Sequence, residues 1–199
     1  MFDCDGVLFD SWRANVAFYG AVLEAAGLPP LDEEWERRAH VMASSQLFGE
    51  LFGHDEALLA RVHEVSRSTD YGPFYQLMEP AEGLHEVLAT LRATHRLAMA
   101  SNRGRTVREV ARRFGLDRWL ECVVGARDVE RPKPHPDMLL ACAERLRVAP
   151  GRTLYVGDAR SDLEAATAAG MHFVALGDFD WAPRRIARLR DLPGYVAAL

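Results

Sequence analysis

The chain contains almost no lysine. Of its 24 basic residues only Lys133 is a lysine, and all the others are arginines. An ammonium group is a compact point charge whereas a guanidinium group is a broad planar fork, so a single lysine in such a background indicates a position whose shape excludes arginine. The alternative is that Lys133 is retained by chance, and composition leaves both explanations open.

An excess of basic charge and long apolar runs are also missing. The formal net charge is -5 at pH 7, which argues against a nucleic-acid partner because phosphate backbones demand a basic surface. The apolar runs are short and the N-terminus does not open with a basic and then apolar leader, so neither export nor membrane insertion is expected. The cysteines lack the paired spacing of a zinc site or a disulfide framework: Cys4, Cys122 and Cys142. We therefore expect a cytoplasmic globular protein.

From about residue 84 onward, short apolar runs alternate with amphipathic stretches. Strands are expected at residues 96–100, 121–124, 153–156 and 173–176. Helices are expected at residues 83–92, 106–114, 137–146 and 162–169. Gly115 and Gly170 follow two of these helices and favour left-handed caps. Such alternation predicts an α/β fold, with a Rossmann-like parallel sheet and helices on both faces.

Residues 1–5 are expected to form the first strand of this sheet. Only two residues precede Asp3, whereas strands usually run for about five to six residues. Our hypothesis is that a few apolar residues precede Met1 in the natural chain.

Strand signals disappear between Ser11 and Met78. Helix-like stretches take their place at residues 12–26, 31–40, 45–52 and 55–68. This pattern predicts an all-helical insertion. We expect residues 1–12 and 79–199 to form the catalytic core and residues 13–78 to form a helical cap.

Polar clusters recur where the expected strands end. There are four: Asp3 with Asp5, Ser101 with Asn102, Lys133, and Asp158 with Asp162. The carboxyl ends of parallel strands line the ligand crevice of an open sheet, so the four clusters are expected to meet in one pocket.

The acidic clusters favour a hard metal ion. Asp3 and Asp5 lie two apart on a strand that is ending, so both carboxylates can project to one side, and Gly6 allows a sharp turn. With Asp158 they make an all-oxygen set that suits Mg²⁺. The seven histidines are scattered and form no competing ligand set.

The other two clusters favour an anion. Ser101 and Asn102 lead from a strand into a helix, so backbone N–H groups and the hydroxyl can face a phosphate. Alone, this segment is more often an ordinary helix start. Lys133 stands among prolines at 132, 134 and 136, which give one cation a rigid mount. A simple loop before the next helix is the alternative.

Together the four segments resemble the haloacid dehalogenase-like superfamily, in its phosphoglycolate phosphatase and beta-phosphoglucomutase-like group with a helical cap. The matching segments cover almost the whole chain: Phe2-Asp3-Cys4-Asp5-Gly6-Val7-Leu8-Phe9-Asp10-Ser11, Ala100-Ser101-Asn102, Lys133-Pro134 and Gly157-Asp158-Ala159-Arg160-Ser161-Asp162.

The resemblance implies a role for each site residue. Asp3 would attack phosphorus, and Asp5 would protonate the leaving oxygen and then activate water. The phosphoryl group would be held by Ser101, Asn102 and Lys133. Mg²⁺ would be bound by Asp3, Asp158 and the main-chain carbonyl of Asp5, with Asp162 supporting the metal from its edge.

The expected activity is therefore a magnesium-dependent phosphatase that acts on a small phosphorylated metabolite through an aspartyl-phosphate. Asp5 argues against dehalogenation, because the dehalogenases of the superfamily lack that acid. The insertion contains no lysine, which argues against the Schiff-base chemistry of phosphonate-cleaving members. A sugar phosphomutase and a catalytically idle phospholigand-binding module remain as alternatives, and a monomer or a homodimer is equally compatible with the sequence.

Overall fold

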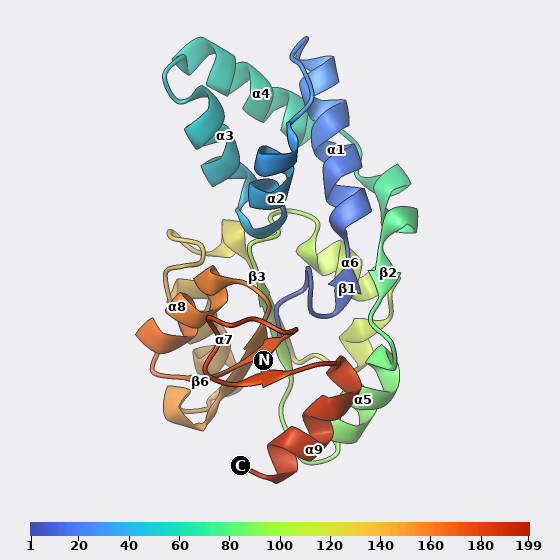
Figure 1. Ribbon diagram of the computed structural model, residues 1–199, viewed down its shortest axis with the longest axis vertical. Coiled ribbons are helices and arrows are strands. Elements are labelled where there is room, and N and C mark those ends of the chain that lie inside the picture. Colours follow the sequence, from blue (N-terminus) through green and yellow to red (C-terminus); the bar gives the residue numbers. More distant parts are fainter. The chain divides into compact units, whose positions relative to one another are not determined.

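The computed structural model describes residues 1–199 and contains two compact units. Met1–Asp10 and Pro80–Leu199 form the first unit, and Ser11–Glu79 forms the second (Figure 1). These boundaries lie one or two residues from those expected from the sequence. None of the helices combines the length and the apolar composition needed to cross a membrane.

The first unit is built on a parallel sheet. Its strands are β3 (Ala98–Ser101), β4 (Cys122–Gly125), β5 (Leu154–Gly157), β6 (His172–Leu176) and β7 (Arg185–Ile186). β3 pairs with β4, β5 with β6 and β6 with β7, all in parallel. Phe2 forms parallel bridges with both Met99 and Val156. It therefore joins the two groups of strands in the order β4, β3, Phe2, β5, β6, β7.

The first five residues differ from the expected strand. Only Phe2 pairs with a strand on each side. The ammonium group of Met1 donates to the carbonyl oxygen of Leu154 at 2.9 Å. After Asp3 the chain turns at Gly6, which has a φ of 73°, and Asp5 bridges to Phe9. The short strands β1 (Phe9–Asp10) and β2 (Glu79–Pro80) lie where the chain leaves and re-enters this unit.

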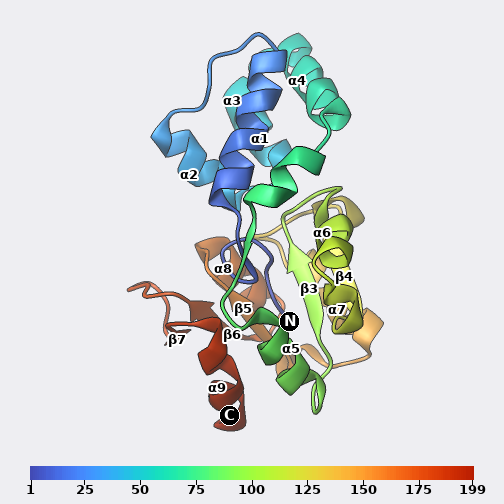
Figure 2. The same cartoon turned by 90° about the vertical axis from the view of Figure 1, so that its right-hand side faces the viewer.

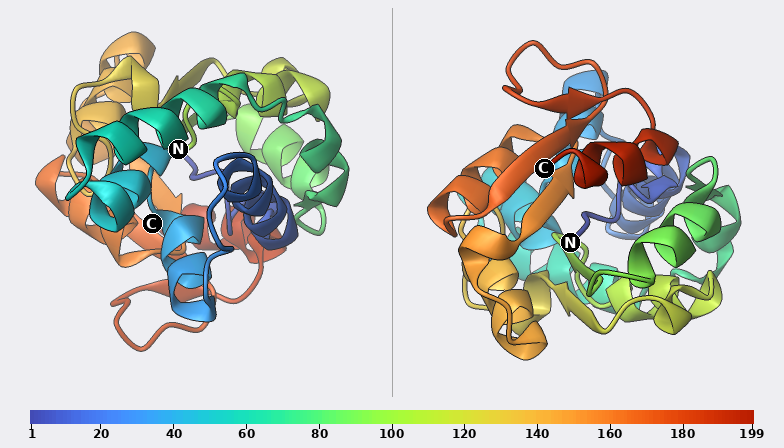
Figure 3. Two further views of the ribbon diagram at one scale, coloured as in Figure 1. Left: turned by 90° about the horizontal axis from the view of Figure 1, so that it is seen from above. Right: turned by 90° about the horizontal axis from the view of Figure 1, so that it is seen from below.

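Helices cover both faces of the sheet, as predicted (Figure 2). The first unit contains α5 (Leu84–Arg92), α6 (Val107–Arg113), α7 (Asp137–Leu146), α8 (Arg160–Ala168) and α9 (Leu192–Ala197). Side chains of α7 and α8 pack in one buried cluster with alternate sheet residues such as Ala98, Ala100 and Tyr155. Successive strand residues point to opposite faces, so the intervening residues face the other side of the sheet. α5 and α9 lie on that side (Figure 3, right).

Short 3-10 turns complete this unit at Leu116–Arg118, Ala126–Asp128, Pro150–Arg152 and Leu189–Asp191. Gly115 and Gly170 adopt positive φ values of 64° and 70° after their helices. The left-handed caps predicted from the sequence are thus confirmed.

The second unit is helical, as predicted. It contains α1 (Trp12–Ala25), α2 (Glu33–Val41), α3 (Ser44–Phe52), α4 (Glu56–Ser68) and the 3-10 helix Gly72–Leu77. The carboxylates of Asp32 and Asp55 accept the N–H groups of Trp35 and Leu58, so each fixes the start of a helix. Aromatic side chains, including that of Phe18, pack together inside this unit.

Candidate active site

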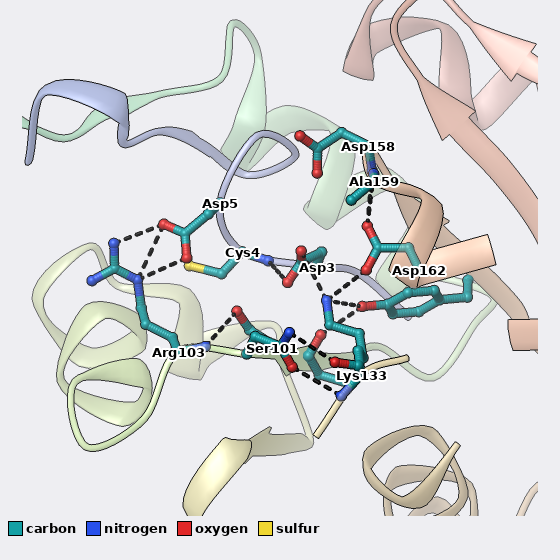
Figure 4. A network of polar contacts seen from close by, with 12 residues as sticks. Asp3, Cys4, Asp5, Ser101, Arg103, Lys133, Asp158, Ala159 and Asp162 are labelled. Atoms are coloured by element: carbon teal, nitrogen blue, oxygen red, sulfur yellow. Dashed lines mark hydrogen bonds and ion pairs between the residues drawn. The ribbon is translucent and has the colours of Figure 1, made fainter. Parts of the chain in front are cut away.

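The side chains expected from the four sequence clusters meet at one edge of the sheet (Figure 4). Asp3 follows the bridging residue Phe2, Ser101 ends β3, and Asp158 follows β5. Lys133 reaches the same place from the loop before α7. The arrangement follows from the parallel sheet, because the carboxyl ends of all its strands lie at this edge.

Lys133 lies at the centre of the cluster. Its side chain is 1% exposed, and its Nζ lies 2.6 Å from Asp162 Oδ1, 2.9 Å from Asp3 Oδ2 and 2.9 Å from the hydroxyl of Tyr155. Burial alone lowers the pKa of the ammonium group, but the charges of Asp162 and Asp3 outweigh burial and raise it above its ordinary value. Lys133 is therefore a fixed positive charge.

Asn102 holds the backbone of Lys133 in place. The side-chain oxygen of Asn102 accepts the Lys133 N–H at 3.0 Å, and its Nδ2 donates to the Lys133 carbonyl at 3.2 Å. These two bonds tie the end of β3 to the loop that carries the ammonium group. Asn102, expected to bind substrate, thus has its side chain turned to Lys133.

The carboxyl group of Asp3 has a pKa close to neutral pH. Its Oδ1 accepts the N–H of Cys4 at 2.7 Å, and its Oδ2 faces Lys133. Burial raises the pKa of Asp3 to about 7, with Asp162 and Asp5 acting in the same direction and Lys133 opposing them. Any further cation at the site would favour the ionised form.

Three carboxylates form a compact oxygen cluster. Ligand atoms of Asp3, Asp158 and Asp162 all lie within 4.8 Å of one another. Burial, followed by the charges of Asp162 and Asp3, raises the pKa of Asp158 well above its ordinary value. Such mutual repulsion is relieved by a hard cation, and an all-oxygen donor set fits Mg²⁺. Gly6 is required beside this cluster because a Cβ there would lie 1.9 Å from Asp158 Oδ2.

Asp162 is fully buried and satisfied by the protein itself. Its Oδ2 accepts the N–H groups of Asp158 and Ala159 at 3.0 and 3.1 Å, while its Oδ1 faces Lys133. Asp162 therefore shapes the loop that presents Asp158. This geometry agrees with a supporting position at the edge of a metal site.

Asp5 faces a different cation. Its carboxylate meets the guanidinium of Arg103, with Nη2 at 2.7 Å from Oδ1 and Nε at 3.0 Å from Oδ2. In Figure 4 the Asp5 carboxylate lies on the side of the loop away from Lys133. The candidate nucleophile Asp3 and the candidate acid Asp5 are thus paired with separate cations, Lys133 and Arg103.

Two residues of this site were missed from the sequence. These two are Arg103, which directly follows Asn102, and Tyr155, which lies in the strand expected at residues 153–156. Tyr155 donates its hydroxyl to the carbonyl of Ala100 at 2.7 Å and accepts from Lys133. A tyrosine within an otherwise aliphatic run next to the Gly157-Asp158 segment is the one signal that could have pointed to it.

Comparison with known sequences points in one direction. A family model described as haloacid dehalogenase-like hydrolase matches residues 1–176. The phosphoglycolate phosphatase of Escherichia coli (strain K12) is 49% identical over 61 residues, covering 31% of this chain and 24% of that enzyme. The match therefore spans about a quarter of that relative. A phosphorylated carbohydrates phosphatase of Thermotoga maritima is 30% identical over 181 residues, covering 86% of this chain and 81% of that protein.

The fold has solved relatives as well. The crystal structure of a HAD-superfamily hydrolase from Geobacter sulfurreducens superposes with a TM-score of 0.76 and 34% sequence identity. The superposition covers 98% of this chain and 94% of that chain.

Proposed function

Because the chain belongs to the haloacid dehalogenase-like hydrolase family, we propose that it hydrolyses a small phosphomonoester through an aspartyl-phosphate formed on Asp3. The observation that carries this proposal is the position of Asp3 beside Lys133. The Asp3 carboxylate is nearly buried, keeps one oxygen on the Cys4 N–H, and has the Lys133 ammonium 2.9 Å from the other. This contact supports the proposal, because it puts the proposed nucleophile beside the proposed phosphoryl-binding cation.

In this proposal Lys133 stabilises the negative charge of the substrate phosphate. A carboxylate repels a phosphate, and a fixed ammonium group between them lowers that repulsion. Asn102 and Tyr155 keep the cation still, because they hold its backbone and its Nζ. The hydroxyl of Ser101 is buried at the end of β3 and accepts the Arg103 N–H at 3.2 Å. We assign Ser101 to the phosphoryl oxygens.

Asp5 supplies proton transfer. It lies two residues after the nucleophile, and in this proposal it protonates the leaving oxygen and then takes a proton from the water that attacks the aspartyl-phosphate. General acid and base steps of this kind contribute about 10²- to 10⁴-fold in rate. An idle binding module would have no use for an acid beside the nucleophile.

Mg²⁺ is the proposed cofactor, held by Asp3 and Asp158, with the main-chain carbonyl of Asp5 as a further ligand and Asp162 at the edge. When bound, it would neutralise charge on the phosphoryl oxygens. The clustering of Asp3, Asp158 and Asp162 within 4.8 Å and the raised pKa of Asp158 support the assignment.

A small phosphorylated metabolite is the proposed substrate. The names of the relatives support this class, since one is a phosphoglycolate phosphatase and another acts on phosphorylated carbohydrates. The helical unit formed by Ser11–Glu79 is the proposed cap.

Phosphate release from a panel of small phosphomonoesters tests the proposal, with Mg²⁺ or with EDTA. We expect magnesium-dependent turnover in the wild type, loss of turnover in Asp3→Asn, and wild-type rates in the control Asp117→Asn, whose side chain is exposed and distant in sequence. Isomerisation of a sugar phosphate without net phosphate release would instead identify a phosphomutase. A folded wild type that binds Mg²⁺ and turns over no substrate would refute the proposal.

A further inference from the structure

Arg103 and Asp5 form a largely buried ion pair. Its side chains are 6% and 12% exposed, so both charges are largely withdrawn from water. The guanidinium engages both carboxylate oxygens, through Nε at 3.2 and 3.0 Å and Nη2 at 2.7 Å. A bidentate contact of this kind fixes direction as well as distance, which a lysine could not do.

Arg103 is itself held from several sides. Its N–H donates to Ser101 Oγ, its carbonyl oxygen accepts the N–H of Ala126 at 3.1 Å, and its Nη1 donates to Thr106 Oγ1 at 3.3 Å. The space behind its backbone is closed as well, since a Cβ on Gly125 would lie 2.6 Å from the Arg103 carbonyl oxygen. The guanidinium is therefore a rigid reference point at the end of β3.

Asp5, by contrast, stands on a turn. It lies between the nucleophile and Gly6, whose φ is 73°, and the chain folds back there toward Phe9. Fixed partners are what hold a catalytic carboxylate within the small tolerance that chemistry allows.

We propose that Arg103 is a positioning residue that sets the place of the Asp5 carboxylate for proton transfer. The inference rests on the proposed function of Asp5. In a phosphoryl transfer the attacking and leaving oxygens lie roughly in line, so the leaving oxygen is on the far side of phosphorus from Asp3. In Figure 4 the Asp5 carboxylate lies apart from Asp3 and beside Arg103.

The dependence on the leaving group tests this role. An alkyl phosphate needs a proton on its leaving oxygen, whereas p-nitrophenyl phosphate releases a phenolate that needs little protonation. In the first turnover of Arg103→Gln, we expect alcohol release from the alkyl ester to fall on the order of 10²-fold. Release of p-nitrophenol in the first turnover is expected to stay within about 3-fold of wild type, since no acid is required there.

Further variants separate positioning from folding. Arg103→Lys keeps the charge but loses the fork, so it should recover only part of the alkyl rate, with the KM close to that of wild type. Arg108→Gln serves as the matched control, because Arg108 is a half-exposed residue of α6 that pairs with Asp128, and it should leave the rates with both substrates unchanged. Because each comparison is a ratio of two substrates on one variant, a smaller folded fraction cancels.

The outcomes distinguish the inference from the function on which it rests. A wild type that releases neither alcohol nor p-nitrophenol with Mg²⁺ present would overturn both. If the wild type turns over both esters and Arg103→Gln loses both rates equally, or neither, the function stands and the positioning role is wrong.

Discussion

Replacement of Lys133 by methionine is expected to destabilise the protein strongly when no metal is present. The substitution keeps a side chain of similar length but removes a buried positive charge, since the Lys133 side chain is 1% exposed. It leaves Asp3, Asp158 and Asp162 together, with ligand atoms within 4.8 Å and no cation among them.

The size of the effect follows from the burial of the pair. Removing one partner of a buried ion pair costs about 3–5 kcal/mol, because the other charge stays buried and uncompensated. For a chain of this length each kcal/mol corresponds to about 2–4 °C in Tm. We therefore expect Lys133→Met to melt roughly 6–20 °C below wild type in EDTA at about pH 8.

Two conditions should reduce the loss. Saturating Mg²⁺ supplies a cation to the same oxygens, so the difference in Tm should shrink. Acid should act similarly: Lys133 normally lowers the pKa of Asp3, so in the variant that pKa rises above the wild-type value of about 7. The carboxylate is then protonated at about pH 5 and the repulsion falls.

Thermal unfolding followed by circular dichroism measures these differences. Arg131→Met is the matched control, because Arg131 lies two residues before Lys133 in the same loop and its side chain, paired with Asp137, is exposed. Such pairs contribute about 0–1 kcal/mol, so its Tm should stay close to that of wild type. A Lys133→Met protein that melts with the control in EDTA would show that the ammonium group does not stabilise the buried carboxylates.

Two further predictions concern the first unit, one at Asp3 and one at its N-terminal end. Asp3→Asn should be more stable than wild type above about pH 7 without metal: the folded pKa of Asp3 is raised from 3.8 to about 7, so wild-type stability present at low pH is lost as the pH rises through 7, and asparagine does not titrate. Urea denaturation at about pH 4 and pH 8 would reveal this, and an equal difference at both pH values would contradict it. An engineered extension of about three apolar residues ahead of Met1 should enter the groove lined by Leu97 and Leu154. It should raise the free energy of unfolding by about 1–3 kcal/mol, because the free energy gained by burying apolar surface exceeds the entropic cost of ordering the added residues. A Gly-Ser extension of equal length is the control for the measured Tm, and equal Tm values for the two would contradict the prediction.

Much of the fold follows from local pattern, and the departures have physical causes. α7 was predicted over residues 137–146, as found. α8 begins at Arg160, two residues before the prediction, because Asp162 is the third residue of the helix and its carboxylate reaches back to the N–H groups before it. α9 was not predicted. Its segment Leu192–Ala197 contains Pro193 and Gly194, poor helix formers, and packs through the buried Leu192.

The convergence of the site was predictable for a topological reason. Asp3, Ser101 and Asp158 each follow a strand, and a parallel sheet brings such positions to one edge. The structure brings these residues and Lys133 together. Arg103 could not be singled out in the same way, since it is one of many arginines and its partner lies 98 residues away in the chain.

The two buried cations at the site show why composition carried information about one of them. Lys133 donates from a single nitrogen to Asp3, Asp162 and Tyr155, at 2.6–2.9 Å and from different directions. A planar guanidinium cannot place one nitrogen among three such oxygens without displacing them, so arginine is excluded there. Arg103 does the opposite and turns its flat edge to the two oxygens of one carboxylate. In a chain whose other basic residues are all arginines, the single lysine therefore stands where a point charge is needed. Arg103 fits its site equally well, but composition cannot distinguish it from the other arginines.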